Sequence, residues 1–110
     1  MQKYIFRACI RLKKSGRLSD KDKEEIVEEI NKFDIRPIYF RLGEKRNFLL
    51  KKYIYLNIFF YISIKCRDEV DAVHKKLAIK KTIHEMIKVL EGFKVVEYWC
   101  NCKNMHSKID

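Results

Sequence analysis

The sequence predicts an α+β fold in which a four-stranded antiparallel sheet carries two helices on one face. Two patterns lead to this prediction: apolar residues alternate with polar ones in four segments, and they recur at helical spacing in two others. With 3 glycines and 1 proline among 110 residues, the chain has few places for flexible linkers. We therefore expect one domain over residues 1–102, followed by a polar C-terminal tail over residues 103–110.

The first strand is expected from Lys3 to Leu12, where alternate side chains point to opposite faces of the sheet. Arg7 and Arg11 would lie on the face turned away from the helices. The inward positions are all apolar: Tyr4, Phe6, Ala8, Ile10 and Leu12. Gly16 then permits the turn that leads into the first helix.

The first helix is expected to begin after Ser19, a typical N-cap residue. Asp22 stands three residues later, at the position that completes a capping box, where glutamate or glutamine is more usual. The apolar stripe of the helix consists of Ile26, Val27, Ile30 and Phe33. Its opposite face is rich in glutamate, which makes the helix a poor contact for nucleic acid.

The second strand is expected from Ile35 to Leu42, with Tyr39 and Arg41 turned away from the core. A hairpin turn over residues 43–46 would then lead into a long third strand, Tyr53 to Cys66. Every even position of that strand is apolar. Its odd positions are mostly aromatic or polar: Tyr53, Tyr55, Asn57, Phe59, Tyr61, Ser63 and Lys65. The third strand therefore has one core face and one aromatic face.

The second helix is expected to begin at Asp68 and to run to about Glu91, with Gly92 as its C-terminal stop. Its inward side chains are expected to come from two apolar sets, one in each half of the helix. The first set is Val70, Val73 and Leu77, and the second is Ile83, Met86, Ile87 and Leu90. Because the second set is out of phase with the first, we expect a bend over residues 78–81.

The last strand is expected over Lys94 to Cys102. The sequence does not decide which of two sets forms its inward face: Val95 with Trp99, or Val96 with Tyr98 and Cys100. The resulting order, strand, helix, strand, strand, helix, strand, is that of the ferredoxin-like βαββαβ fold, which leaves one sheet face uncovered. In that arrangement the first and third strands are central, so Arg7 and Arg11 would lie beside the aromatic side chains.

The aromatic face and the net charge of +10 together favour nucleic acid as the partner. Flat rings stack on bases of any identity, and cations neutralise phosphates. We expect single-stranded RNA or DNA to bind with little sequence specificity. The residues assigned to stacking are Tyr53, Tyr55, Phe59 and Tyr61, and those assigned to the phosphates are Arg7, Arg11, Arg41, Lys51 and Lys65.

In this architecture the chain resembles the RNA-recognition-motif family, which stacks bases on its two central strands. Tyr53 and Tyr55 match the spacing of the exposed aromatics on that family's third strand. The glycine-rich signature of the family is absent, and Tyr4 and Phe6 point inward. The resemblance is architectural and does not identify the chain as a member.

The alternative interpretation comes from another functional class. The exposed aromatic face would pair with a second subunit, be covered by the C-terminal tail, or dock on an acidic protein surface. The chain would then be a small non-enzymatic dimeric adaptor or inhibitor, of the mobile-element or viral accessory type, that binds a larger nucleic-acid-handling protein. A lysine-rich composition is also typical of AT-rich or thermophilic genomes, in which case the charge has no specific partner.

Catalysis and metal binding are not expected. His74 and His84 have no nucleophile or carboxylate at a catalytic spacing, and there is no glycine-rich phosphate loop. Cys100, Cys102 and His106 could supply three zinc ligands, with Cys66 or Cys9 as a fourth. Because the spacing is not the usual Cys-x-x-Cys, we expect free thiols, no metal and no cofactor.

The chain is expected to be cytoplasmic, without a membrane partner. The apolar run in the third strand is shorter than the roughly 18–20 residues that a membrane-spanning helix needs. Arg7 and Arg11 interrupt what would be the apolar core of a signal peptide.

Overall fold

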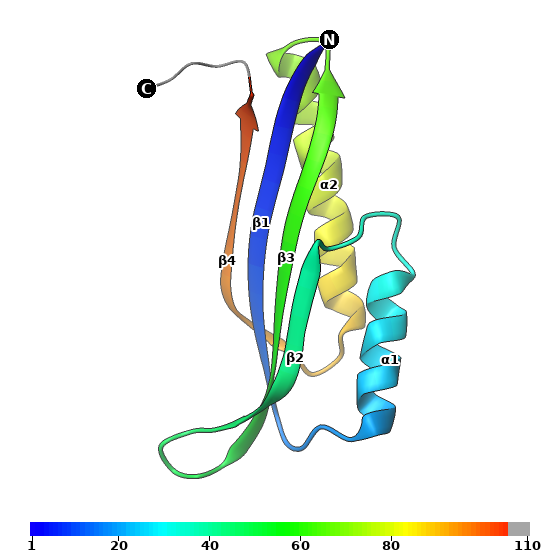
Figure 1. Ribbon diagram of the computed structural model, residues 1–110. Helices are drawn as coiled ribbons and strands as arrows, with labels where there is room; N and C mark the ends of the chain where they lie inside the picture. The colour runs from blue at the N-terminus through cyan, green and yellow to red at the C-terminus, as the bar shows by residue number, and fades with distance from the viewer. Residues whose placement is uncertain (106–110) are drawn as a thin grey trace.

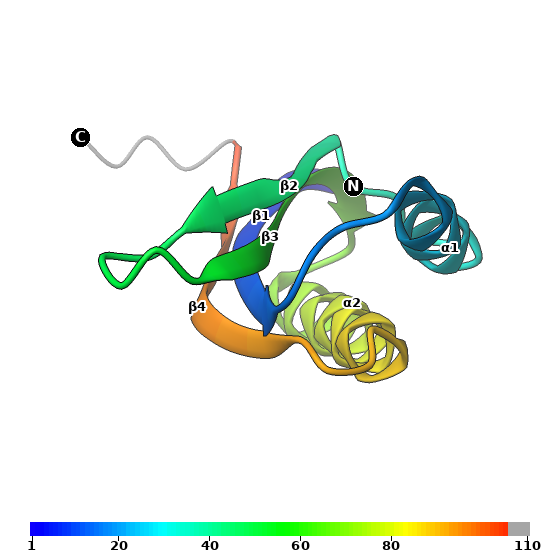
Figure 2. The same ribbon diagram turned by 90° about the horizontal axis from the view of Figure 1, so that it is seen from below.

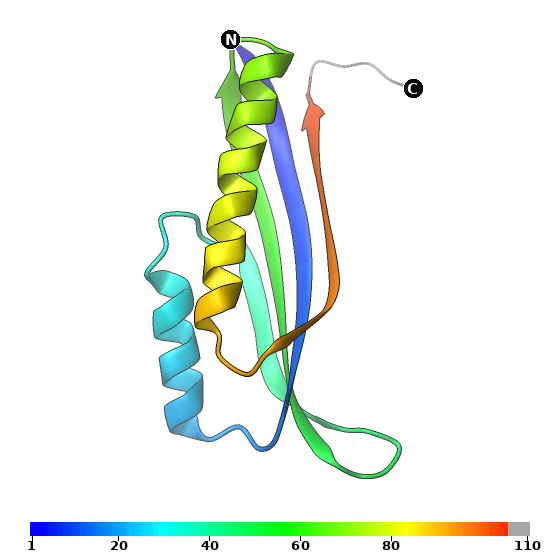
Figure 3. The ribbon, with the colours of Figure 1, turned by 180° about the vertical axis from the view of Figure 1, so that it is seen from behind.

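The computed structural model describes residues 1–105, which form one antiparallel sheet and two helices. The strands follow one another across the sheet in the order β2-β3-β1-β4. Both helices lie on the same side of it (Figures 1 and 3), and the view from below shows the sheet as a curved layer with α1 and α2 beside it (Figure 2). The elements in chain order are β1 (Gln2–Ser15), α1 (Asp20–Asn31), β2 (Tyr39–Arg46), β3 (Lys52–Cys66), α2 (Glu69–Val89) and β4 (Lys94–Asn104).

The two longest strands, β1 and β3, occupy the centre of the sheet, as the sequence predicts. They pair antiparallel along their whole length, from Gln2 opposite Cys66 to Ser15 opposite Tyr53. β4 pairs with the free side of β1 and β2 with the free side of β3, both antiparallel. The even-numbered residues of β1 and β3 therefore share one face of the sheet, and the odd-numbered residues share the other.

The hydrophobic core lies between the even-numbered face and the helices. Each helix contributes fully buried side chains to it, so the core spans both layers. The completely buried large residues are Phe6, Ile10 and Leu12 of β1, Ile30 of α1, Leu56, Ile58 and Cys66 of β3, and Ile83 and Met86 of α2. The predicted inward direction of Tyr4 and Phe6 is confirmed, since both are buried on this face.

The start of α1 confirms the predicted capping box. The Ser19 hydroxyl accepts a hydrogen bond from the backbone N–H of Asp22 at 3.1 Å, and the Asp22 carboxylate accepts one from the backbone N–H of Ser19 at 3.3 Å. The hydrogen bonds with Ser19 favour the ionised carboxylate and hold the pKa of Asp22 below its ordinary value. The box thus satisfies two backbone donors that would otherwise be unpaired at the helix start.

The hairpin between β2 and β3 turns later than predicted. β2 covers Tyr39–Arg46, so the expected strand Ile35–Leu42 and the expected turn over residues 43–46 are both wrong. The Asn47 side chain fixes the real turn, because its Oδ1 accepts hydrogen bonds from the backbone N–H of Leu49 at 2.9 Å and of Lys51 at 3.1 Å. A short polar side chain that bonds to the backbone ahead of it favours a turn more strongly than the preceding run of charges.

The tip of this hairpin projects beyond the helices (Figures 1 and 3). Phe48, Leu49 and Leu50 are all exposed there. Leu50 has a φ of 60°, in the left-handed region that a branched residue seldom adopts. The hydrogen bonds to Asn47 hold this conformation.

The predicted inward face of the N-terminal half of α2 is wrong. Val70, Val73 and Leu77 are 66%, 52% and 57% exposed, and the small residue Ala72 is buried in their place. Ala72 packs against Tyr4 and Cys66, where a longer side chain would hold the helix away from the sheet. With Ala72 as the first core residue, the stripe continues in phase to Ile79, Ile83 and Met86, and α2 is one continuous helix without the expected bend.

A bulge in β4 explains why its face was ambiguous in the sequence. Glu97 lies opposite Arg11, but the next pair along is Val95 opposite Leu12, so Val96 is an extra residue. The alternation therefore changes phase at Val96. Tyr98, Cys100 and Cys102 pack against the core, whereas Trp99 points to the other face.

β4 continues to Asn104, so residues 103 and 104 belong to the sheet and not to the expected tail over 103–110. The last five residues of that tail lie outside the described residues. Within residues 1–105, neither helix is both long and apolar enough to cross a membrane.

Candidate functional site

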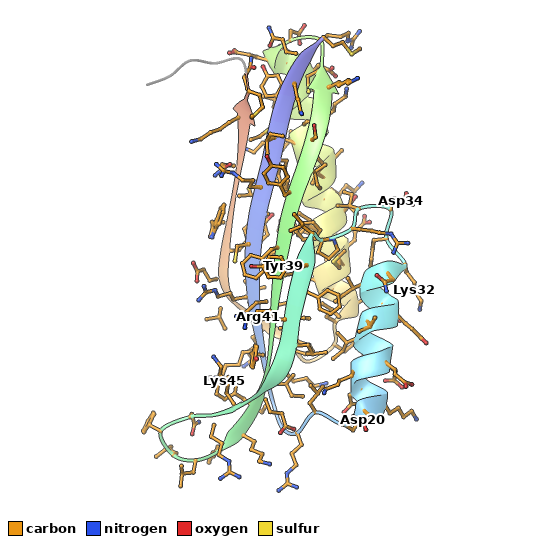
Figure 4. The ribbon with its side chains drawn as sticks, in the orientation of Figure 1. Asp20, Lys32, Asp34, Tyr39, Arg41 and Lys45 are labelled. Carbon is orange, nitrogen blue, oxygen red and sulfur yellow. The ribbon has the colours of Figure 1, made fainter. Side chains whose placement is uncertain are left out.

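The sheet face turned away from the helices, called the open face below, is the candidate site. It comprises the odd-numbered residues of β1 and β3 and the residues in register with them on the two edge strands. Figure 4 shows Tyr39, Arg41 and Lys45 of β2 on this side of the sheet, with α2 behind the sheet and α1 beside it. In residues 1–105 the open face is not covered by any other element, although Ile5 and Cys9 of β1 are buried there among the neighbouring side chains.

Aromatic side chains form a row across the middle of the open face. Tyr39 and Phe59 lie opposite one another and stack with ring centroids 4.5 Å apart and planes inclined by 20°. Cys9 follows on β1 and Trp99 on β4 in the same row. The thiol of Cys9 is buried between its neighbours, while Trp99 remains 44% exposed.

A second row lies next to the first and combines a ring with a cation. Arg7 stands opposite Tyr61 on one side and Asn101 on the other. Its Nε donates to the Asn101 side-chain oxygen at 3.4 Å, and Tyr61 is 51% exposed. Tyr61 and Trp99 are thus two accessible rings on the strands that flank β1, with the guanidinium of Arg7 between those strands.

The third row is polar and mostly basic. Asn57 lies between Arg41 of β2 and Arg11 of β1. Arg11 is 3.5 Å from Glu97, measured from Nε to Oε2, so its charge is partly balanced. Among residues 1–105, neither Arg7 nor Arg41 is part of an ion pair. The charge of these two arginines in the central rows is therefore available to an external anion.

Tyr53 and Tyr55, at the hairpin end of the face, are already in contact with lysines of the same chain. The Nζ of Lys13 lies 4.0 Å from the Tyr53 ring centroid, and that of Lys45 lies 4.9 Å from the Tyr55 centroid. The Tyr55 ring also lies against Gly43, where there is no side chain to keep it away. Both rings are half-buried, so a base that stacked on them would first have to displace the lysines.

The predicted site residues are only partly brought together. Arg7, Arg11, Arg41, Phe59 and Tyr61 lie in the three central rows. Tyr53 and Tyr55 are on the same face, but under lysines. Lys51 is not on the face, because it belongs to the hairpin turn, and Lys65 lies at the opposite end of β3, where its carbonyl accepts a hydrogen bond from the Nζ of Lys75.

Sequence reasoning missed three members of this face: Trp99, Lys13 and Lys45. Tyr39 points outward as predicted, but its pairing with Phe59 depends on a register that the sequence does not state. Trp99 was hidden by the bulge at Val96. Lys13 and Lys45 were assigned to turns, and the structure places both in strands.

The cysteines and histidines lie apart from this site. Cys9 is on the open face, whereas Cys66, Cys100 and Cys102 are on the helix side, so Cys9 cannot join them as a metal ligand. Within residues 1–105 no three His, Cys, Asp or Glu side chains are placed to hold a metal ion, and His106 lies outside the described residues. Burial raises the pKa of the Cys66 and Cys102 thiols, which keeps them protonated and unreactive at neutral pH.

His74 and His84 are carried by α2, behind the sheet. His84 stacks on Tyr98, with ring centroids 5.6 Å apart. Burial raises the pKa of Tyr98 to about 12, so its hydroxyl stays protonated at neutral pH. Both histidines therefore lie on the helix side of the sheet and not on the open face.

Comparison of the chain with models of known protein families, with curated proteins and with solved structures found no match. The open face offers accessible rings at Tyr39, Tyr61 and Trp99, and it carries Arg7 and Arg41, which form no ion pair with any of residues 1–105.

Proposed function

We propose that this chain binds single-stranded nucleic acid, RNA or DNA, on the open face, with little dependence on base sequence. The observation on which the proposal rests is the placement of two exposed rings, Tyr61 and Trp99, on either side of the strand that carries Arg7. Strands separated by one neighbour are about 9–10 Å apart. Bases can therefore stack on the two rings while Arg7 neutralises a phosphate between them.

Single strands are favoured because stacking on a protein ring requires an unpaired base. In a duplex the face of each base is covered by the adjacent bases. The rings on a flat sheet surface therefore cannot stack on it. The arginines contact phosphates, which are the same for every sequence, so charge supplies affinity without base discrimination. The proposed role is binding alone and includes no chemical step.

The fold we propose for this role is the ferredoxin-like βαββαβ arrangement. Three features support it: the helices follow β1 and β3, neighbouring strands are all antiparallel, and the strand order is β2-β3-β1-β4. In that fold the central strands present one face to the helices and one to a ligand. Arg7, Phe59 and Tyr61 all come from the two central strands.

The single tryptophan of the chain provides the test. Titration with oligo(dT) and oligo(U) of about twenty nucleotides should quench Trp99 fluorescence as bases stack on the ring. Tyr61→Ala should weaken binding by about 1–3 kcal/mol, the usual contribution of one stacked base. Ile38→Ala is the matched control, because it also removes an exposed apolar side chain but precedes β2 at a position of the opposite parity.

The charge contribution is tested by salt dependence. Each phosphate contact contributes about 0.7 to the slope of log K against log salt for a single strand. Arg7→Gln and Arg41→Gln should each reduce the slope by about that amount, whereas Lys21→Gln on α1 removes the same charge away from the open face and should leave it unchanged.

Two results would reject the proposal. Binding to heparin as tight as to oligonucleotides of equal charge would show that the rings contribute nothing. Equal losses from Arg7→Gln and Lys21→Gln would show that net charge, and not this face, attracts the polyanion. Either outcome would favour the adaptor class of function, with an acidic protein surface as the partner.

A further inference from the structure

The outer edge of β4 has unpaired backbone groups that can be identified individually. The backbone N–H of Met105 donates to the carbonyl of Lys3 at 2.8 Å, in line with the register that places Tyr4 opposite Asn104. In an antiparallel ladder, hydrogen-bonded and non-hydrogen-bonded pairs alternate. From Glu97 onward the odd-numbered residues of β4 therefore bond to β1, and Tyr98, Cys100 and Cys102 direct their N–H and C=O groups to the free edge.

Apart from the bulge at Val96 and the single Lys103, this edge lacks the devices that usually prevent strands from pairing with other molecules. Lysine, proline and dense charge are the common ones. The other edge strand, β2, has four charged residues, Arg41, Glu44, Lys45 and Arg46, among its eight. From Glu97 to Asn104, β4 has no proline and has Glu97 and Lys103 as its only charges.

Those two charges are placed symmetrically about Cys100. If a second copy pairs antiparallel with β4 and the two-fold axis passes beside Cys100, Glu97 of each copy faces Lys103 of the other. The neighbouring registers lose this match: an axis beside Trp99 places Glu97 opposite Asn101, and an axis beside Asn101 places Lys103 opposite Trp99. Opposite charges directly across an antiparallel pair stabilise it, and the two-fold axis makes the contact twice.

An exposed apolar stripe on α2 adjoins the same edge. Val73 lines a groove of about 510 Å³ together with Ala72 of α2, Tyr4 of β1 and Cys102 of β4. Val70 and Leu77, which are more than half exposed, lie on the same flank of the helix. Pairing along β4 places the two α2 helices antiparallel on one side of the joined sheet, where these flanks are turned toward each other.

We propose that two copies of this chain associate along β4, antiparallel and centred on Cys100, to form an eight-stranded sheet. The backbone groups of Tyr98, Cys100 and Cys102 supply the hydrogen bonds, the Glu97 and Lys103 pairs select the register, and the α2 stripe adds apolar contact. The open faces of the two copies lie on the same side of that sheet, with the two Trp99 side chains near the axis. The inference does not rest on nucleic-acid binding, and it leaves the open face free.

Cross-linking of the full chain tests the register. In this arrangement Cys100 faces Cys100 of the second copy as a hydrogen-bonded pair, with Cα atoms about 5.5 Å apart, inside the range for a disulfide. Copper–phenanthroline, which accepts the two electrons released, should therefore give a covalent dimer. Cys100→Ser should abolish the dimer, and Cys102→Ser, the matched control, should keep it, because Cys102 lies opposite Tyr98.

Sedimentation equilibrium without oxidant tests the association itself, with circular dichroism to confirm that each variant is folded. The expected mass is twice the 13.4 kDa of the chain. Glu97→Lys should raise the dimer dissociation constant about ten-fold or more, and adding Lys103→Glu should restore it, since the swap reverses both charges. Both variants lose the ion pair between Glu97 and Arg11. Association restored in the double variant would therefore show that the charge of residue 97 acts through residue 103 of the second copy and not through Arg11.

Three results would overturn the proposal. The first is a 13.4 kDa species at every concentration up to about 1 mM. The second is a cross-link that survives Cys100→Ser. The third is a dimer that dissociates on Tyr61→Ala but is unaffected by Glu97→Lys, which would place the contact on the open face and not on the edge.

Discussion

Gly43→Ala tests how firmly the Tyr55 ring is held on the open face. A Cβ at residue 43 would lie 2.7 Å from the Tyr55 Oη and 2.9 Å from its Cζ. Both distances are well inside the roughly 3.5–4.0 Å of normal carbon contacts. Gly43 does not have a positive φ, unlike Gly16 and Gly92, so alanine fits the backbone and only the ring opposes it.

The expected effect is the difference between two known contributions. Forcing a methyl group into an occupied space usually costs about 1–3 kcal/mol. Replacing a glycine by alanine in a compatible backbone restores about 0.4–1 kcal/mol, because the unfolded chain loses freedom. Gly43→Ala should therefore destabilise the protein by roughly 1 kcal/mol, within a range of about 0–2.6 kcal/mol. In a Tyr55→Ala background the collision is absent, and the same substitution should stabilise the protein by about 0.4–1 kcal/mol.

Urea unfolding of the four proteins of this cycle, followed by circular dichroism, measures the reversal of sign. The coupling between the two sites should be about 1–3 kcal/mol, typical of residues in direct contact. An effect of Gly43→Ala with the same sign and size in both backgrounds would refute the reasoning. It would mean that the Tyr55 ring swings away at no cost, and that neither Gly43 nor Lys45 holds it in place.

Three further predictions concern the scaffold behind this face. Ser19→Ala removes the N-cap hydroxyl and should lower the free energy of unfolding by about 1 kcal/mol in urea titrations. Ile30→Val, at the fully buried position of α1, should cost about 0.5–1.5 kcal/mol in the same assay, and Ile38→Val, at an exposed position, less than about 0.5 kcal/mol. The backbone N–H of Arg67 donates to the Asp71 carboxylate and holds the pKa of Asp71 below its ordinary 3.8. The ionised carboxylate therefore stabilises the fold above pH 3.8. This contribution disappears as the pH falls through the lowered pKa of the folded protein. Asp71→Asn should therefore reduce the loss of stability between about pH 6 and pH 3, measured as urea midpoints; an unchanged loss would contradict the assignment.

Patterns that repeat along the chain were sufficient to predict the sheet and its centre. Strict alternation in β1 and β3 assigned their faces correctly, because both strands are regular over more than a dozen residues. The capping residues of α1 were equally clear, since a cap is a local hydrogen-bond arrangement. Arg7, Arg11 and Tyr61 were placed on one surface by these two rules alone.

The errors all arose where one residue changed the phase of a pattern. Val96 adds a residue to β4, and an alternation rule then assigns Trp99 to either face. Ala72 is the core contact in this half of α2 in place of the three larger residues Val70, Val73 and Leu77, because close packing selects for size and not only for hydrophobicity. Asn47 moved the hairpin turn by four residues through its side-chain hydrogen bonds. Each of these depends on contacts between distant segments or on local bonding that composition does not reveal.

The sheet also divides the four thiols of the chain into two separate compartments. Cys9 lies under the aromatic row on the open face, and the other three lie between the sheet and α2. The rate of Cys9 alkylation therefore measures how often the aromatic side chains beside it move apart. Alkylation of Cys66 instead requires α2 to move off the sheet. A ligand seated on the rings would slow the first reaction and leave the second unchanged, so the chain contains its own pair of chemical reporters, one for each side of a sheet that is a single layer thick.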